Sequence, residues 1–403
     1  MRKKVTLRFL IGSFIIFCAL GMAAILIARS SNTPISTPVA TSSAEKDILT
    51  TNIKAKVLQI VSTSQETVPD STTPAPVQTI QVQILEGSEQ GKIVEFSNDY
   101  IMLNVGDTFF LQSVVRSTGV ESYSVSDPDR LPVIFFFLIL FLLLVVIFGG
   151  IQGLRGLLSL AGSFLIIIFV LLPAIIHGFS PLPVSIAVSS LIIIVGSYVT
   201  HGFNKTTSSA VIGMIITVVI TGFMAFYGVH ASHLTGITND ETLYLVSTNI
   251  DLVGLLMGGI MIGLLGVLYD ISIGQAISVE ELYQVAPHLG RWKIYKRAIR
   301  MGREHIGALV NMLAIAYVGA SLPLLLLFYP ANGSSTSFFM TINKEIFTTE
   351  ILRTLIGSIG LVLAVPITTL LSAYMLIKIK KQKPSEEILK KEEMELEHTD
   401  HHH

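Results

Sequence analysis

The chain has 403 residues, of which 51% are hydrophobic and only 14% carry a charged side chain, and its mean hydropathy is +0.68. Soluble domains carry about 25% charged residues, so this composition excludes an ordinary soluble protein and predicts an integral membrane protein. The net charge of −1 gives no reason to expect a nucleic-acid partner. The single cysteine, Cys18, excludes an intramolecular disulfide and a zinc site made of several thiolates. We expect no cofactor and no bound metal.

Residues 1–29 are expected to form an N-terminal signal anchor. Basic residues precede an apolar run from Phe9 to Ala28, which is long for a cleaved signal peptide and lacks a good cleavage pattern. An uncleaved first transmembrane helix is therefore expected, with a cleaved signal peptide as the alternative. In both cases the following segment is exported. Residues 30–46 are rich in Ser, Thr and Pro and are expected to form a linker.

Residues 47–130 have a different composition and predict an extracytoplasmic β-rich domain. Short runs rich in Val, Ile, Thr and Phe alternate with turn residues such as Gly87 and Gly106. Five short strands in so few residues indicate a small antiparallel barrel or sandwich. The Pro-rich segment 63–76 is expected to be a loop. The expected strands are 53–61, 77–85, 92–96, 107–115 and 120–125.

Residues 131–377 return to apolar runs long enough to cross a membrane. Together with the first helix they predict an all-α polytopic membrane bundle of about eight transmembrane helices, into which the β domain is inserted. Prolines interrupt two neighbouring runs, 157–176 and 184–200, so a re-entrant hairpin is the alternative there. The expected spans are 131–151, 157–176, 184–200, 208–228, 251–273, 305–329 and 351–377.

The distribution of Lys and Arg predicts the orientation. Most of the 27 basic residues fall on one side of the expected spans, whereas the loops at 177–183 and 229–250 contain none. Both termini are therefore expected in the cytoplasm. The basic segment 275–301 is interpreted as a loop that contacts anionic lipid headgroups, with a cytosolic partner as the alternative. Residues 378–403 form a charged cytoplasmic tail, whose histidines are interpreted as a terminus or tag rather than as a metal site.

Asp270 lies within the expected span 251–273, near its cytoplasmic end, whereas Asp251 stands at the outer end of that span. An acid at the centre of a bilayer costs about 2.5–3.5 kcal/mol, so Asp270 requires a solvating environment. Solvation at the membrane interface is one interpretation, and a carboxylate that binds a proton or cation in a cavity is the other. If the helix continues past Gly274, Glu281 shares a face with Asp270. Eleven residues turn a helix by about 1100°, which is only about 20° more than three full turns.

The expected span 305–329 supplies the other polar candidates. Arg303 and Glu304 stand at its start, and Asn311 lies at a depth similar to that of Asp270. An Asp270–Asn311 contact is expected if the two spans pack through small residues. Each of these two residues also has a purely structural interpretation. Glu304 could be an acid placed favourably at a helix N-terminus, and Asn311 could form an interhelical hydrogen bond. The small residues expected in helix packing are Gly259, Gly263, Gly266, Gly274 and Gly307.

Several motifs resemble the YibE/F family of bacterial multi-span membrane proteins. The resemblance covers about residues 130–330, and its motifs follow one another in the same order. It implies a bacterial cell membrane location but no biochemical role. The motifs are GGIQGLR (149–155), GFNKT (202–206), GLLGVLYD (263–270), EEL (280–282), GREHI (302–306), Asn311 and AYVG (316–319).

Two classes of function are compatible with these features. The first is a transporter or channel component for an ion or small solute, in which Asp270 binds the coupling ion, Asn311 orients it, and Glu304 or Arg303 forms an inner gate. The alternative is a membrane-anchored scaffold or sensor whose exported β domain binds a ligand or partner. An intramembrane enzyme is not expected, because the spans contain neither a second apposed aspartate nor the zinc-protease pattern. The expected partners are the lipid bilayer and a second copy or a related membrane protein.

Overall fold

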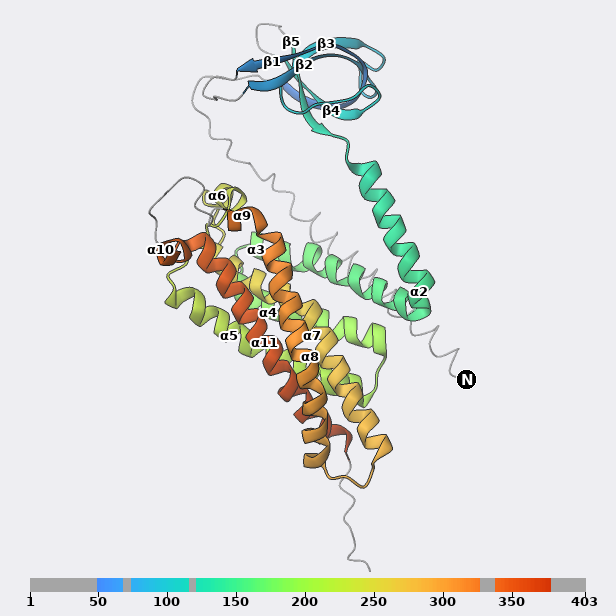
Figure 1. The fold of residues 1–403 in the computed structure, drawn as a ribbon, viewed down its shortest axis with the longest axis vertical. Helices are drawn as coiled ribbons and strands as arrows, with labels where there is room; N and C mark the ends of the chain where they lie inside the picture. The colour runs from blue at the N-terminus through green and yellow to red at the C-terminus, as the bar shows by residue number, and fades with distance from the viewer. Residues whose placement is uncertain (1–48, 68–73, 116–120, 327–337, 378–403) are drawn as a thin grey trace, which may run out of the picture. The chain divides into compact units, whose positions relative to one another are not determined.

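The computed structural model describes residues 49–67, 74–115, 121–326 and 338–377 (Figure 1). These residues fall into two compact units that divide between Gly149 and Gly150. We call them the β unit and the helical unit, and each is described by itself. The expected signal anchor, the linker and the charged tail lie outside the described residues.

The β unit contains a five-stranded antiparallel sheet in the order β3-β2-β1-β4-β5. The five predicted strands are confirmed, and the first two are longer than expected. The strands are β1 (Leu49–Thr67), β2 (Pro74–Ile84), β3 (Ile93–Asn98), β4 (Thr108–Val115) and β5 (Glu121–Pro128).

Two irregularities in β1 curve this sheet. The register between β1 and β2 shifts between Val57 and Gln59 and again between Ile60 and Ser62. Bulges of this kind bend a strand and increase its twist. The result is a half-barrel, in which β3 and β5 form the two edges of the sheet (Figure 1). A closed barrel or a sandwich is therefore not confirmed.

The predicted loop 63–76 is wrong over most of its length. β1 continues to Thr67 and pairs there with Pro74 at the start of β2. The prolines are tolerated because β3 pairs with β2 only from Gln78 onward. Pro74 and Pro76 therefore border an open edge, where a missing N–H group removes no bond to β3.

The inner face of the half-barrel holds an apolar core, which the loop between β3 and β4 covers at one end. Leu103 in that loop is only 4% exposed. The Gln78 side chain donates to Leu103 O at 3.1 Å and accepts from Leu103 N at 2.8 Å, so a buried amide fixes the loop. The core residues are Ala55, Val57, Ile80, Val82, Ile84, Val94, Leu103, Phe109, Leu111 and Val125.

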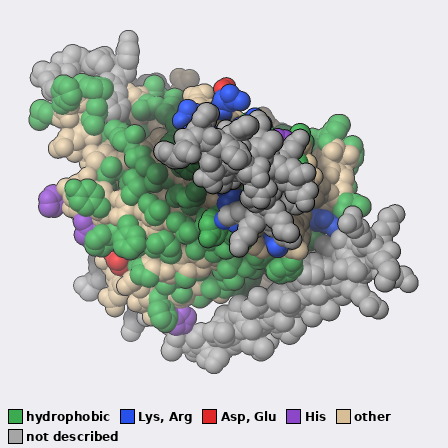
Figure 2. Space-filling model, turned by 90° about the horizontal axis from the view of Figure 1, so that it is seen from below, with side chains coloured by type: hydrophobic (Ala, Val, Ile, Leu, Met, Phe, Trp, Pro, Cys, Tyr) green, Lys and Arg blue, Asp and Glu red, His purple; other side chains and the backbone are tan. Residues whose placement is uncertain are grey.

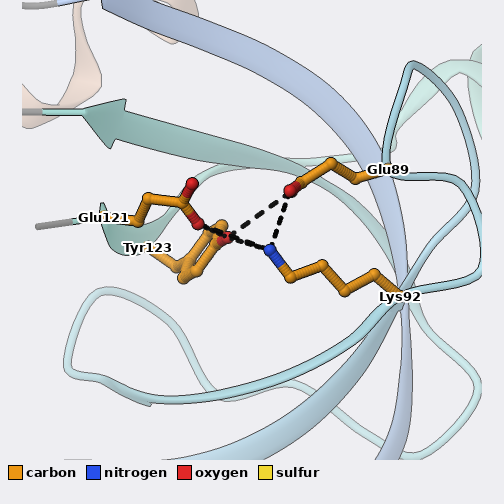
Figure 3. A network of polar contacts seen from close by, with 4 residues as sticks. All are labelled: Glu89, Lys92, Glu121 and Tyr123. Carbon is orange, nitrogen blue, oxygen red and sulfur yellow. Dashed lines mark hydrogen bonds and ion pairs between the residues drawn. The ribbon is translucent and has the colours of Figure 1, made fainter. Parts of the chain in front are cut away.

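Side chains connect the two edges of the sheet (Figure 3). Lys92, next to β3, lies 2.8 Å from Glu89 and 3.4 Å from Glu121 of β5. Tyr123 Oη donates to Glu121 at 2.6 Å, and Lys92 Nζ donates to Tyr123 Oη at 3.2 Å. The hydrogen bonds that Lys92 donates to Glu89 and Tyr123 raise the pKa of Lys92, and the bonds that Glu121 accepts from Tyr123 and Lys92 lower the pKa of Glu121. A network of polar side chains thus links edges that share no ladder of backbone hydrogen bonds in the described residues.

Five helical stretches of the described chain are long and apolar enough to cross a membrane. They are Leu131–Ile176, Pro181–His201 (α4), Lys205–Ala231 (α5), Leu252–Val285 (α7) and Glu345–Leu376 (α11). The remaining helices are α8 (Arg291–Ala320) and the short α6 (Asp240–Leu245), α9 (Leu322–Leu326) and α10 (Phe338–Ile342).

The first of these stretches contains two of the predicted spans. It consists of α2 (Leu131–Ile166), a π-helical segment η1 (Ile167–Leu171) and α3 (Leu172–Ile176). Gly150 has φ 53° and ψ −140°, so α2 is kinked one residue before the end of the predicted span 131–151. The total of eight spans is not confirmed, because the first expected helix lies outside the described residues and α8 is not among the five apolar stretches.

The predicted loop 275–301 is wrong. α7 continues through it to Val285 and α8 begins at Arg291, so only residues 286–290 connect the two helices. The polar residues that resembled a loop instead form the last turns of one helix and the basic first turns of the next. Trp292 stacks on Tyr295 with ring centroids 5.0 Å apart, and Arg291 donates to Ile377 O of the α11 C-cap at 3.0 Å.

Helices α5, α7 and α11 pack against one another in the interior of the helical unit. Small residues allow close approach: a Cβ at Gly213 of α5 would lie 3.0 Å from Thr368 Cα of α11. Ser209 and Ser372 hydrogen-bond across the same interface at 2.8 Å, and Gly360 faces Thr221. Small and hydroxyl-bearing side chains therefore form these close contacts, beside an apolar core of Ile, Leu, Val and Met side chains.

The predicted packing stripe is only partly found. Gly263 of α7 faces the Tyr317 hydroxyl of α8. The other four glycines, three on α7 and one on α8, have open space where a Cβ would be. These four are Gly259, Gly266, Gly274 and Gly307.

The sides of the helical unit are covered by hydrophobic side chains. Figure 2 looks onto the end that carries the α7–α8 connection; green side chains dominate the visible sides, and Lys and Arg side chains gather near this end. An apolar exterior and a partly polar interior are the arrangement expected of a membrane protein, because lipid solvates apolar side chains.

Candidate functional site

Asp270 lies on α7 and is exposed on the surface of the helical unit. Its electrostatic neighbour is His201, the last residue of α4. Among the described residues, no Lys or Arg side chain pairs with the Asp270 carboxylate. The adjacent Tyr269 points to α4, where its hydroxyl donates to Gly196 O at 3.3 Å. The structure therefore brings Asp270 to a histidine that the sequence analysis did not pair with it.

The expected Asp270–Asn311 contact is not present. Both residues are described, both are exposed, and no hydrogen bond joins them. Arg303 and Glu304 are exposed on α8, inside the helix rather than at its start, because α8 begins twelve residues before Arg303. The helix-terminus explanation for Glu304 is therefore wrong. Glu281 is also exposed, on the continuation of α7 that places it near the face of Asp270.

The connection between α4 and α5 places His201 beside α7. Gly202 follows His201 with φ 76°, a conformation that side chains other than glycine rarely adopt. Asn204 then caps α5, because its Oδ1 accepts from Thr207 N at 2.6 Å. The turn is held on its other side by Tyr198, which stacks on Phe203. This local geometry directs both His201 and the first turn of α5 toward α7.

A small open pocket of about 120 Å³ lies where this turn meets α7. On one side it has polar groups, including the half-buried Glu280, whose Oε2 accepts from Thr206 Oγ1 at 2.7 Å. Apolar side chains of α7, the helix that also carries Glu280, complete the lining. His201 belongs to the pocket wall and also neighbours Asp270. The lining residues are His201, Asn204, Thr206, Thr207, Ile273, Ala276, Ile277 and Glu280.

A second buried polar contact lies deeper between α7, α8 and α11. Thr369 Oγ1 donates to Gln275 Oε1 at 2.9 Å. The Gln275 side chain also fills the space beside Gly302 of α8, where a Cβ would be 2.5 Å from its amide nitrogen. Gly302, and not the predicted Gly307, is thus the glycine that lets α8 approach α7.

The comparison with protein families bears on the helical unit. Residues 137–378, more than half of the chain, match the family described as YibE/F-like protein. The chain belongs to the YibE/F-like family. The match extends past the region of the resemblance and includes α11, while almost all of the β unit lies outside it. No curated protein and no solved structure matches this YibE/F-like protein.

His201 and Glu280 were not among the residues predicted for the site. Both lie in segments that carry the family resemblance, one directly before GFNKT and one as the first residue of EEL. Glu281 was selected because it shares a helical face with Asp270, whereas tertiary packing buries its neighbour Glu280. The sequence did contain a signal for this pair. His201 follows the end of one expected span, and Glu280 follows another span on the same side of the membrane.

Proposed function

We propose that this YibE/F-like protein is a component of a transporter or channel that moves an ion or small solute across the bacterial cell membrane. The observation that supports it is Asp270: an acid within an apolar helix of 34 residues, next to His201 and without a basic ion-pair partner in the described chain. Ionisable residues in membrane helices are costly and mark ion or proton paths when no structural pair explains them.

The interior of the helical unit supports the same proposal. Buried hydroxyl and amide groups lie along α4, α5, α7 and α11, and several find no hydrogen-bond partner in the described residues. Such groups can solvate a passing polar species in place of water. The buried hydroxyls without a partner include Ser189, Ser197, Ser272, Thr349 and Thr368.

Roles for the exposed residues of α7 and α8 remain part of the proposal. In it, Asp270 binds the coupling ion with His201 beside it, Asn311 helps to orient the ion, and Arg303 or Glu304 forms an inner gate.

The orientation proposed from the charge distribution has the α7–α8 connection in the cytoplasm and the β unit outside. Cysteines introduced singly at Gly290 and at Tyr100, in a Cys18→Ser background, should then label from opposite sides of the membrane.

The test is flux in proteoliposomes, with protons, inorganic cations and small solutes compared at several pH values. Asp270→Asn should abolish the flux that the wild-type protein supports. Asp251→Asn is the matched control, because Asp251 caps the other end of α7 by accepting from Gly254 N at 2.9 Å, and asparagine is an equally good cap. Normal flux in Asp270→Asn would eliminate the proposed role of this carboxylate.

The second candidate is a scaffold or sensor that uses the β unit. The loop between β3 and β4 exposes four large hydrophobic side chains: Tyr100 at 60%, Ile101 at 38%, Met102 at 45% and Val105 at 62%. An apolar loop of this kind favours a contact with a partner or ligand. Deleting residues 45–125 separates the two proposals, because a transporter core should keep measurable flux whereas a sensor should lose every response.

A further inference from the structure

We propose that the pocket between the α4–α5 turn and α7 binds a small primary-ammonium cation. Binding of the cation can be tested by itself. Only the further step, that the bound cation is the solute that is moved, rests on the proposed function. The pocket itself is defined by groups from three helices, and Glu280 is its one carboxylate.

The charge of the pocket favours a cation. Glu280 uses Oε2 to accept from Thr206 Oγ1 at 2.7 Å, which leaves Oε1 for a ligand. Among the described residues, no Lys or Arg side chain pairs with this carboxylate, and none lines the pocket. An ammonium group that donates to Oε1 would form a charge-assisted hydrogen bond, which is about twice as strong as a neutral one.

The side chain of Thr207 offers a second acceptor. Thr207 is 3% exposed and lines the pocket. Its backbone N–H is already used by the Asn204 side chain, and no hydrogen bond of its hydroxyl is found in the described part of the chain. A hydroxyl that faces a pocket in this way can accept from the same ammonium group that Glu280 holds.

The apolar part of the lining favours an organic cation over a bare metal ion. Ile273, Ala276 and Ile277 precede Glu280 on the same face of α7 and line the pocket, and they would contact a short alkyl chain. A hard metal ion such as Ca²⁺ or Mg²⁺ takes about six to eight oxygen ligands, whereas apolar side chains supply none. The described residues contain no group of three or more His, Cys, Asp or Glu side chains that could hold a metal. The volume of about 120 Å³ limits the ligand to a few heavy atoms.

Binding of ethylammonium to the purified full-length protein in detergent tests the assignment. Wild-type protein should bind it saturably, whereas ethanol, of similar shape without charge, and tetramethylammonium, without N–H donors, should not compete. Glu280→Gln retains an acceptor for Thr206 but removes the charge, and should weaken binding at least roughly tenfold. Thr207→Val should weaken it by a smaller factor.

Glu281→Gln is the matched control for binding. It removes the same charge one residue later, from an exposed side chain that does not line the pocket, so the affinity for ethylammonium should change little. If folded wild-type protein fails to bind, or if the two Gln variants bind equally, the assignment is overturned. Competition by sodium alone would also overturn it. The outcome is separate from that of the Asp270→Asn flux test, because binding is measured without transport.

Discussion

The two units of this protein differ in where they place polar groups. In the β unit an apolar core is enclosed, and only Gln78 and Asn98 are buried polar residues among those described. In the helical unit the buried polar residues include many Ser and Thr, while large apolar side chains cover the outside. The two arrangements suit different solvents. Exclusion of water favours the enclosed apolar core of the β unit, and lipid favours the apolar exterior of the helical unit.

The difference predicts that each unit responds to a different kind of substitution. Loss of apolar volume should be most harmful in the β unit, where exclusion of water drives folding. Gain of volume should be most harmful in the helical unit, where close backbone approach holds the helices together. The experiments below test this contrast in order of decreasing effect.

The largest effect is expected from Phe109→Ala. Phe109 is fully buried in β4 at 0% exposure, and removing such a ring costs about 3–5 kcal/mol. Hydrogen–deuterium exchange of the full-length protein should become fast throughout β1, β2 and β4. Exchange in α5 and α11 should not change. Faster exchange in those helices would show that the units do not unfold independently, and would break the comparison.

Gly213→Val should have the next largest effect, and on the other unit. The added side chain would meet Thr368, including its Cα at 3.0 Å, and overpacking of this kind costs about 1–3 kcal/mol. The loss of helical circular dichroism on heating should occur at a lower temperature. Gly266→Val is the matched control, because nothing lies within 4 Å of its Cβ position. Equal destabilisation by both variants would contradict the assignment of close packing to α5 and α11.

The glycines of α7 also show what the sequence could and could not predict. Apolar runs were sufficient to locate the long helices, and alternation with turn residues was sufficient to locate the strands. Small residues at helical spacing indicated packing on α7, but spacing does not say which face a neighbouring helix occupies. Gly258, one residue from the predicted stripe, faces Ser185 of α4, whereas Gly259 faces open space.

The same limit applies to the site. Asp270 was identified because its charge is unusual in an apolar run. His201 could not be paired with it, since 68 residues separate them and only the turn at Gly202 brings α4 beside α7. Likewise, Glu280 and Glu281 are equivalent as sequence, and only the hydrogen bond to Thr206 distinguishes the acid in the pocket from the exposed one.

Glu121→Gln should have the smallest effect, and it sharpens the description of the β unit's edges. Bonds from Tyr123 and Lys92 lower the pKa of Glu121 in the folded state. Its stabilisation is therefore complete above the pKa of the unfolded chain and is lost as the pH falls through the lower folded pKa. Between neutral pH and about pH 3, the wild-type β unit should lose more stability than the variant, measured by exchange in β3 and β5. High salt should reduce the difference, because these groups are partly exposed and screened. Identical acid responses would show that the network in Figure 3 does not hold the open edges of the half-barrel together.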